Sequence, residues 1–119
     1  MVRASSRPGF TGQVILLIGP DSVSEAEVFA MSLFGRQPRV TMVGDNTQGV
    51  FSDVMERTLP NGWHFRLPNE IYFAEDGRSF DAVGVPPDVR VPVFSEQDLR
   101  NGRDSALEKA IELLGRAKR

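Results

Sequence analysis

The chain has 119 residues, enough for one domain with a single core, and its 40% apolar and 25% charged residues are ordinary for a globular protein. A formal net charge of −2 and the lack of a basic stripe argue against a nucleic-acid-binding surface, and no segment approaches the roughly 20 apolar residues that a membrane span requires. The sequence contains no cysteine, which excludes disulfides, thiolate metal sites and a cysteine nucleophile.

The first strand is predicted from a continuous apolar run, Val14–Ile18, that ends at Gly19 and Pro20. A run of this kind is typical of a strand buried on both faces of a sheet. Residues 1–12, which precede it, have no apolar signal core and are interpreted as a flexible lead-in or an artificial boundary. Residues 13–119 are then the folded part.

A helix is predicted to follow this strand, and Gly35 is predicted to end it. The spacing i, i+3, i+4, i+7 predicts its buried face, which would contain Ala26, Phe29, Ala30 and Leu33. Val40–Val43 reads as a second strand, so the two strands and the helix form a parallel βαβ unit. The polar loop Gly44–Gly49 follows the carboxyl end of that strand. We expect it to lie beside the start of the helix, although it could equally be a simple turn.

A β-hairpin is predicted next, with one strand in Val50–Leu59 and its turn at Pro60-Asn61-Gly62. Alternation in the second strand predicts that Trp63, Phe65 and Leu67 face the core and that His64 points away from it.

The last third of the chain is predicted to be mainly extended and polar before one final helix. Ile71–Phe73 is interpreted as a short strand, and the prolines of the extended segment Val89–Val93 favour an edge position. Ser95–Arg103 reads as a polar connector. Asp104 is predicted to cap a helix that has Leu107, Ala110, Ile111 and Leu114 on one face.

Ser24, at the start of the first predicted helix, allows two interpretations. Ser22 with Glu25, or Ser24 with Glu27, matches a capping box, and capping serines are common. A serine at a strand-to-helix turn also lies beside free backbone N–H groups, an arrangement that acyl-transfer enzymes use to hold an oxyanion. The local pattern alone favours the cap.

Several motifs together resemble the C-terminal-processing (tail-specific) serine peptidases and their tricorn-like relatives. They are Ser24–Ala30, Gly35-Arg36, Val43–Gly49, Leu59–Trp63, Asp76-Gly77-Arg78 and Gly84–Val89, in that order. The resemblance covers about Gln13 to the end of the chain. It implies an α/β fold with a crotonase/ClpP-like core, comprising the parallel βαβ unit, a β-hairpin and a C-terminal helix. It also implies that Ser24 is the nucleophile and that the Glu25 backbone N–H is an oxyanion donor.

The general base is the difficulty in this resemblance. The tail-specific branch has a lysine after a Thr-x-Gly motif, where this chain has Val50 after Thr47-Gln48-Gly49, and the two lysines here are Lys109 and Lys118. The tricorn-like branch has an upstream histidine and a late acidic residue, a position that Asp81 loosely fits; an ordinary turn carboxylate is the slightly favoured interpretation. The sole histidine, His64, reads as a solvated strand residue.

The predicted function is that of a serine-type peptidase acting through an acyl-enzyme on Ser24, here as an incomplete catalytic domain without its base. The family's upstream Asn-x-Gly-Gly-like loop has no counterpart in the 23 residues before Ser24. A non-catalytic relative that binds a peptide or apolar ligand, and a structural domain in which Ser24 only caps a helix, are the alternatives. No cofactor or metal is expected, because Glu25 and Glu27 point apart on a helix and no histidine cluster supports them.

The expected partners are a peptide or protein substrate, and either a second copy of the chain or the upstream segment of the same protein. A second copy or that segment would cover the exposed edge of the first strand. The resemblance suggests the bacterial cell envelope, and the compartment stays open.

Overall fold

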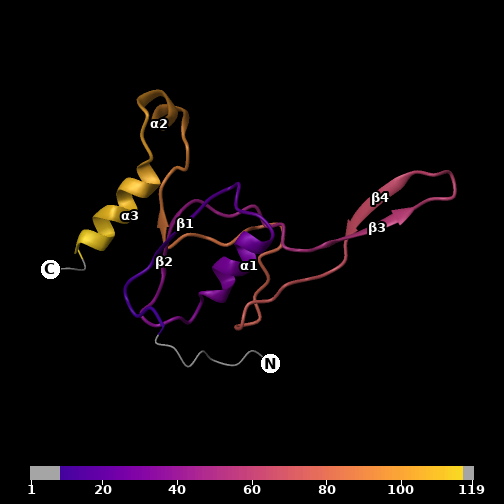
Figure 1. Ribbon diagram of the computed structural model, residues 1–119, viewed down its shortest axis with the longest axis horizontal. Coiled ribbons are helices and arrows are strands. Elements are labelled where there is room, and N and C mark those ends of the chain that lie inside the picture. Colours follow the sequence, from indigo (N-terminus) through magenta and orange to yellow (C-terminus); the bar gives the residue numbers. More distant parts are fainter. Residues whose placement is uncertain (1–8, 117–119) are drawn as a thin grey trace.

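A three-stranded parallel sheet forms the centre of the chain, of which the computed structural model describes residues 9–116 (Figure 1). β1 (Ile15–Ile18) pairs with β2 (Thr41–Gly44), with Ile15 opposite Thr41, and β2 pairs with β5 (Val89–Arg90). The strand order β1-β2-β5 confirms the two predicted strands and the edge position of the segment that starts at Val89. Residues 1–8 of the predicted lead-in lie outside the described part.

The helix α1 (Glu25–Ser32) connects β1 to β2 and completes the predicted βαβ unit. Its buried residues are Glu27 and Ala30, whereas Phe29 is 56% exposed. The predicted apolar face of this helix was therefore only partly correct: Ala30 is buried, but Ala26 and Phe29 are exposed. The reason is that α1 turns a carboxylate, and not its largest apolar side chain, toward the body of the protein.

The hydrophobic core lies between α1, the sheet and the loops that follow β2. Its buried members include Ile18, Ala30, Met42, Phe51, Phe80 and Val85. The ring of Phe34 packs edge-on against Phe80, with centroids 5.8 Å apart. The prediction that the first strand is buried on both faces was wrong, because Leu17 is 41% exposed. The predicted exposed edge of this strand is present, since β1 lies at the edge of the sheet among the described residues.

The hairpin of β3 (Val54–Thr58) and β4 (His64–Pro68) projects away from the body (Figure 1). Its turn at Leu59–Gly62 confirms the predicted position, with the Gly62 N–H bonded to the Leu59 carbonyl oxygen at 2.8 Å. The prediction that Trp63, Phe65 and Leu67 face the core was wrong, since all three are exposed and Trp63 is 72% exposed. Within residues 9–116, no helix or strand packs on either face of this hairpin. The alternation of apolar and polar residues therefore distinguishes two faces, but neither of them is buried.

Ile71–Phe73 does not form a strand, in contrast to the prediction. The side chain of Tyr72 packs near the ring of Phe51, at 6.3 Å between centroids, while the backbone of this segment has no strand partner among the described residues.

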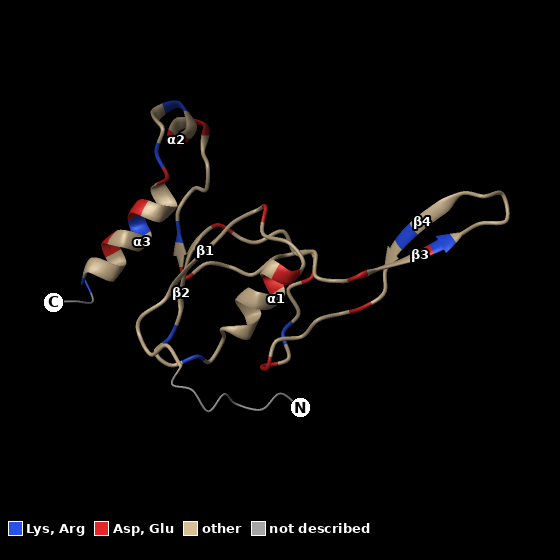
Figure 2. Ribbon diagram, in the orientation of Figure 1, with Lys and Arg blue, Asp and Glu red and all other residues tan. Residues whose placement is uncertain are grey.

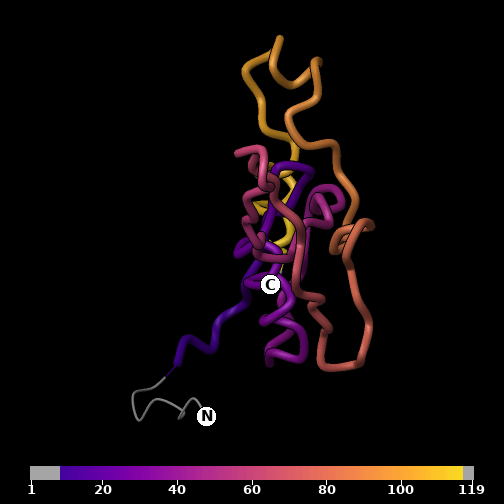
Figure 3. Tube along the Cα trace, turned by 90° about the vertical axis from the view of Figure 1, so that its right-hand side faces the viewer, coloured from indigo at the N-terminus to yellow at the C-terminus, as the bar shows by residue number. Residues whose placement is uncertain are grey.

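The C-terminal part contains two helices, α2 (Glu96–Asn101) and α3 (Ser105–Arg116). The connector predicted at 95–103 is thus partly helical, with the Ser95 hydroxyl accepting the Asp98 N–H at 3.2 Å. Asp104 caps α3 as predicted, through a 2.9 Å bond from the Leu107 N–H. α3 lies against β1 and β2 and buries Ala106 and Ala110. Figure 3 shows the segment that carries α2 extending from one end of the body.

The chain as a whole is open, with a radius of gyration of 18.0 Å and extents of 65 × 47 × 24 Å. A compact domain of this size has a radius of gyration of about 13 to 14 Å. The projecting hairpin and the α2 segment account for the difference. In the described part of the chain, no helix has the length and apolar content to cross a bilayer.

Candidate active site

Ser24 lies in a strained turn between β1 and α1. Its backbone angles are φ 55° and ψ −122°, and the Ala26 N–H donates to the Val23 carbonyl oxygen at 3.1 Å. These are the angles of the first central residue of a type II′ turn, a position that glycine normally occupies. A non-glycine residue there costs on the order of 1–3 kcal/mol, and such outliers cluster at active sites. A strained serine between a strand and a helix is also how nucleophile elbows present their hydroxyl.

The backbone of Ser24 is fixed from both sides, while its hydroxyl is not used for capping. The Ser24 N–H donates to the Val50 carbonyl oxygen at 2.8 Å and to the Glu27 carboxylate at 3.2 Å. The bond from the Ser24 N–H to the Glu27 carboxylate is the reciprocal half of a capping box. The other half is not formed: the Glu27 N–H donates to the Ser24 carbonyl oxygen at 2.8 Å, and the Ser24 hydroxyl makes no cap hydrogen bond.

The Glu27 carboxylate is fully buried and ties α1 to the loop after β2. In addition to the Ser24 N–H, it accepts the Gly49 N–H at 2.7 Å, the Val50 N–H at 2.8 Å and the Thr47 hydroxyl. A buried charge is tolerated when several donors satisfy it in this way. Sequence reasoning treated Glu27 only as a capping residue. The Thr47-x-Gly49 motif, which supplies two of the donors to this carboxylate, is the sequence signal that could have identified Glu27 as the link between α1 and the loop after β2.

The loop 45–50 lies beside Ser24, as the topology predicted. Besides the contacts of Val50, the Gln48 N–H donates to the Ser22 carbonyl oxygen at 3.0 Å. A second loop, residues 79–85, packs on it, because the Thr47 hydroxyl accepts the Val85 N–H at 2.7 Å and the Ala82 N–H donates to the Gly49 carbonyl oxygen at 2.8 Å. The two loops and the start of α1 therefore form one hydrogen-bonded unit.

The N–H of Glu25, the first residue of α1, is available as a donor. Over residues 9–116 it donates no hydrogen bond. The amino end of a helix carries partial positive charge, so a free N–H here suits an oxyanion.

Asp81 lies on the 79–85 loop, one residue before Ala82. Its carboxylate accepts the Ser79 hydroxyl at 3.2 Å and makes no hydrogen bond with Ser24.

Val50, at the position of the family's lysine, has a 52% exposed side chain. His64 lies on the projecting hairpin, where its Nδ1 is 3.1 Å from the Thr58 hydroxyl. Among the described residues, no lysine or histidine contacts Ser24.

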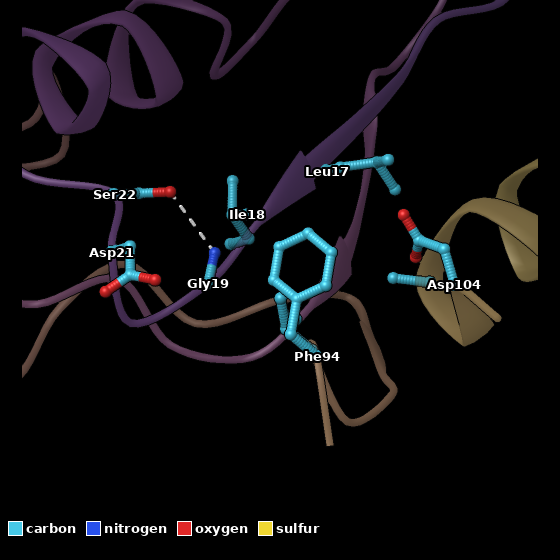
Figure 4. A pocket seen from close by; sticks show the side chains of 9 residues that line it. Leu17, Ile18, Gly19, Asp21, Ser22, Phe94 and Asp104 are labelled. Carbon is cyan, nitrogen blue, oxygen red and sulfur yellow. Dashed lines mark hydrogen bonds between the residues drawn. The ribbon is translucent and has the colours of Figure 1, made fainter. Parts of the chain in front are cut away.

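Two cavities border the site. One, of about 220 Å³, lies at the carboxyl end of β1 between Leu17, Ser22, Phe94 and Asp104 (Figure 4). The Ser22 hydroxyl there accepts the Gly19 N–H at 3.2 Å, so Ser22 stabilises the turn after β1. The other, the hairpin-base cavity, has a volume of about 550 Å³ and extends from Gly49 and Val50 to the base of the hairpin and to Asp81.

Comparison with known proteins supports the fold. The structure superposes on that of a protein described as a peptidase from Parabacteroides merdae, with 32% identity and a TM-score of 0.77 over 92% of this chain and 34% of that one. It also matches the tricorn protease, at 21% identity and a TM-score of 0.73 over 98% of this chain and 12% of that one, which concerns the fold alone. The predicted α/β fold of the crotonase/ClpP-like type is thereby confirmed.

The sequence comparisons agree with this fold. The chain is 28% identical over 104 residues to a protein of Sulfurisphaera tokodaii named as a tricorn-like protease C-terminal subunit, covering 86% of this chain and 12% of that protein. The chain thus spans about a third or less of these relatives. Residues 2–91 match the profile of peptidase family S41. Because this match covers most of the 119 residues, the chain belongs to peptidase family S41.

Proposed function

We propose that Ser24 is the nucleophile of a serine peptidase and that the Glu25 N–H is one of its oxyanion donors. The strained backbone of Ser24, held by Glu27 and Val50 with its hydroxyl free of a cap hydrogen bond, is the observation that supports this proposal. A serine needed only as a cap would use its hydroxyl and would have no reason to adopt a glycine conformation.

In the proposed reaction, the Ser24 Oγ attacks the carbonyl carbon of a peptide bond, and the oxyanion that forms accepts the Glu25 N–H. Collapse of this tetrahedral species releases the amine and leaves an acyl-enzyme, which water hydrolyses. A base must take the Ser24 proton. Since neither Val50 nor the distant His64 suits this role, we propose that the base and the second oxyanion donor come from outside this chain. Asp81 is a candidate for an acidic residue that orients that base.

The test is labelling with a fluorophosphonate probe, followed by peptide mapping. We expect selective labelling of Ser24 once the upstream segment proposed to supply the base is joined to this chain, loss of labelling in Ser24→Ala, and no change in Ser32→Ala, an exposed serine on the same helix. The isolated chain should give only the background of its Ser24→Ala variant. Labelling of another serine would refute the assignment of the nucleophile, and Ser24-dependent hydrolysis by the isolated chain would refute the external base.

A second candidate function is binding of a peptide or apolar ligand without catalysis. It is favoured by Val50 at the lysine position and by the apolar walls of the hairpin-base cavity. In that case the same joined chain would bind a ligand saturably, would not turn it over, and would bind equally well as Ser24→Ala.

A further inference from the structure

The hairpin-base cavity adjoins the turn of Ser24. It begins at Gly49 and Val50, and the carbonyl oxygen of Val50 accepts the Ser24 N–H at 2.8 Å. A peptide whose scissile bond lay at Ser24 would therefore place a neighbouring side chain near the mouth of this cavity. This inference rests on the proposed role of Ser24.

The walls of the cavity are mainly apolar, and its charged groups are carboxylates. The apolar lining residues include Val50, Phe51, Val54, Pro68, Ile71 and Ala82. Glu70 and Asp81 also line it, and no lysine or arginine does among the residues of the described part. A long apolar stem with a cationic end matches such a lining, because the stem packs on the walls while the head pairs with the carboxylates.

Both carboxylates are positioned by neighbouring hydroxyl groups. The Ser52 hydroxyl accepts the Glu70 N–H at 3.0 Å, and the Tyr72 hydroxyl donates to the Glu70 carboxylate at 3.2 Å. Asp81 accepts the Ser79 hydroxyl at 3.2 Å. The contacts of Glu70 join the two connections at the base of the hairpin, and the contact of Asp81 lies within the 79–85 loop. Both carboxylates remain able to accept further donors.

Acidic residues lie close to the cavity. Figure 2 shows acidic positions at the start of α1 and on both connections that lead to the hairpin, and basic positions on the hairpin strands β3 and β4. The pKa of Tyr72 is raised, first by its hydrogen bond to Glu70 and then by the negative charges of Glu70, Asp53 and Glu25. The nearest charges to Tyr72 are therefore carboxylates, and one of them, Glu25, directly follows Ser24.

We propose that the hairpin-base cavity binds the lysine or arginine side chain of a peptide substrate, with its methylene groups against the apolar walls and its cationic head at Glu70 and Asp81. An uncharged apolar side chain of equal length would fill the cavity but would give neither carboxylate a cationic partner. A glutamate side chain would be repelled.

The test measures binding and not turnover, so that it does not depend on a base. Three peptides, acetyl-Ala-Ala-X-Ala-Ala-amide with X as lysine, norleucine or glutamate, are titrated into the Ser24→Ala chain, and the NMR shifts of the Gly49, Val50 and Phe51 amides are followed. We expect the lysine peptide to bind about fivefold more tightly than the norleucine peptide, and the glutamate peptide to bind least.

Matched variants separate the cavity from the general charge of the protein. Glu70→Gln should remove most of the preference for lysine over norleucine, whereas Glu75→Gln, which removes the same charge from an exposed carboxylate that does not line this cavity, should keep it. Norleucine binding as tightly as lysine, a preference insensitive to Glu70→Gln, or no shift with any peptide would each refute the proposal. The probe-labelling experiment reports on Ser24 separately, so failure of the nucleophile and failure of this cavity are distinguishable.

Discussion

At the scale of single residues, Glu27 has the largest effect on the geometry of the site. Its buried carboxylate accepts three backbone N–H groups and the Thr47 hydroxyl. Glu27→Gln keeps the shape but has one acceptor oxygen, and its NH₂ group faces other donors. We expect the free energy of unfolding to fall by about 2–4 kcal/mol, measured by urea denaturation, because buried N–H groups lose their acceptors.

Glu25→Gln is the matched control for this prediction, because it changes an exposed glutamate on the same turn of α1. Its effect should stay within about 0.5 kcal/mol. Equal effects of the two substitutions would mean that the Glu27 network contributes little to stability.

The strained backbone of Ser24 gives a second prediction at this scale. Glycine relieves the strain at φ 55°, whereas alanine keeps the strain and also lacks the hydroxyl. We therefore expect Ser24→Gly to be about 1 kcal/mol more stable than Ser24→Ala after the larger entropy of glycine in the unfolded chain is included. Thermal denaturation of the two variants would measure the difference. A Ser24→Ala variant as stable as Ser24→Gly would show that the turn is unstrained.

At the scale of elements, the packing of the 79–85 loop on the 45–50 loop depends on Gly84. A Cβ atom at Gly84, whose φ is +76°, would lie 1.9 Å from the Thr47 carbonyl oxygen. Gly77 has a similar φ of +82°, but nothing lies within 4 Å of its Cβ position. Gly77→Ala should therefore cost only the backbone strain, about 1 kcal/mol, whereas Gly84→Ala should cost about 3 kcal/mol or more. Similar costs in chemical denaturation would mean that the loops separate easily.

The junction of α2 and α3 should weaken in acid. The pKa of Asp98 is lowered, chiefly by the hydrogen bond that the Ser105 hydroxyl donates to it at 2.6 Å, and further by Ser95 and the charge of Arg103. A lowered pKa stabilises the fold above the unfolded value of about 3.9, and this contribution is lost as the pH falls through the folded value. The protection factors of the amides around Ser105, which are corrected for the intrinsic pH dependence of exchange, should fall below about pH 4 in the native chain and should depend less on pH in Asp98→Asn. An identical profile in both would refute the coupling.

The parts of the fold that sequence reasoning predicted correctly depend on local signals. Each of these signals depends only on residues that are close together in the sequence. They are the apolar runs before Gly19 and Gly44, the Asn61-Gly62 turn and the Asp104 cap. The buried face of α1 was missed because periodicity counts a glutamate as solvent-exposed. In the structure, three donors from the 45–50 loop and the N–H of the N-cap residue Ser24 stabilise Glu27 in the interior. The hairpin was misjudged because alternation marks an apolar face without showing whether anything covers it.

The site shows the same division. The assignment of Ser24 as the nucleophile came from the resemblance and remains a proposal, whereas its position beside the loop after β2 was predicted from the parallel topology and is present in the structure. Its unusual φ could not be predicted, because a serine at a helix start normally adopts the conformation of a cap. The hairpin-base cavity could not be predicted either, since it requires Glu70 and Asp81, eleven residues apart, to border the same space as Val50.

At the scale of the whole molecule, apolar surface is exposed at both ends. One face of the hairpin contains Phe65 and Leu67, and the outer face of α3 contains Leu107 and Ile111; all four are exposed. Exposed apolar area of this extent marks an interaction surface in most proteins. The edge of β1, which has no strand partner among the described residues, is a further surface open to a partner.

Trp63 provides a direct measure of whether the isolated chain covers this surface by self-association. It is the single tryptophan, and it lies 72% exposed next to the hairpin turn. In dilute solution we expect emission typical of a solvated indole and strong quenching by iodide. At high concentration the apolar faces should associate, so the emission should shift to shorter wavelength, iodide quenching should fall, and sedimentation should show species larger than 13.2 kDa. Leu67→Ser should move this transition to higher concentration because it removes apolar area from the same face. A sedimentation profile that stays monomeric over the whole range would show that these surfaces do not bind one another.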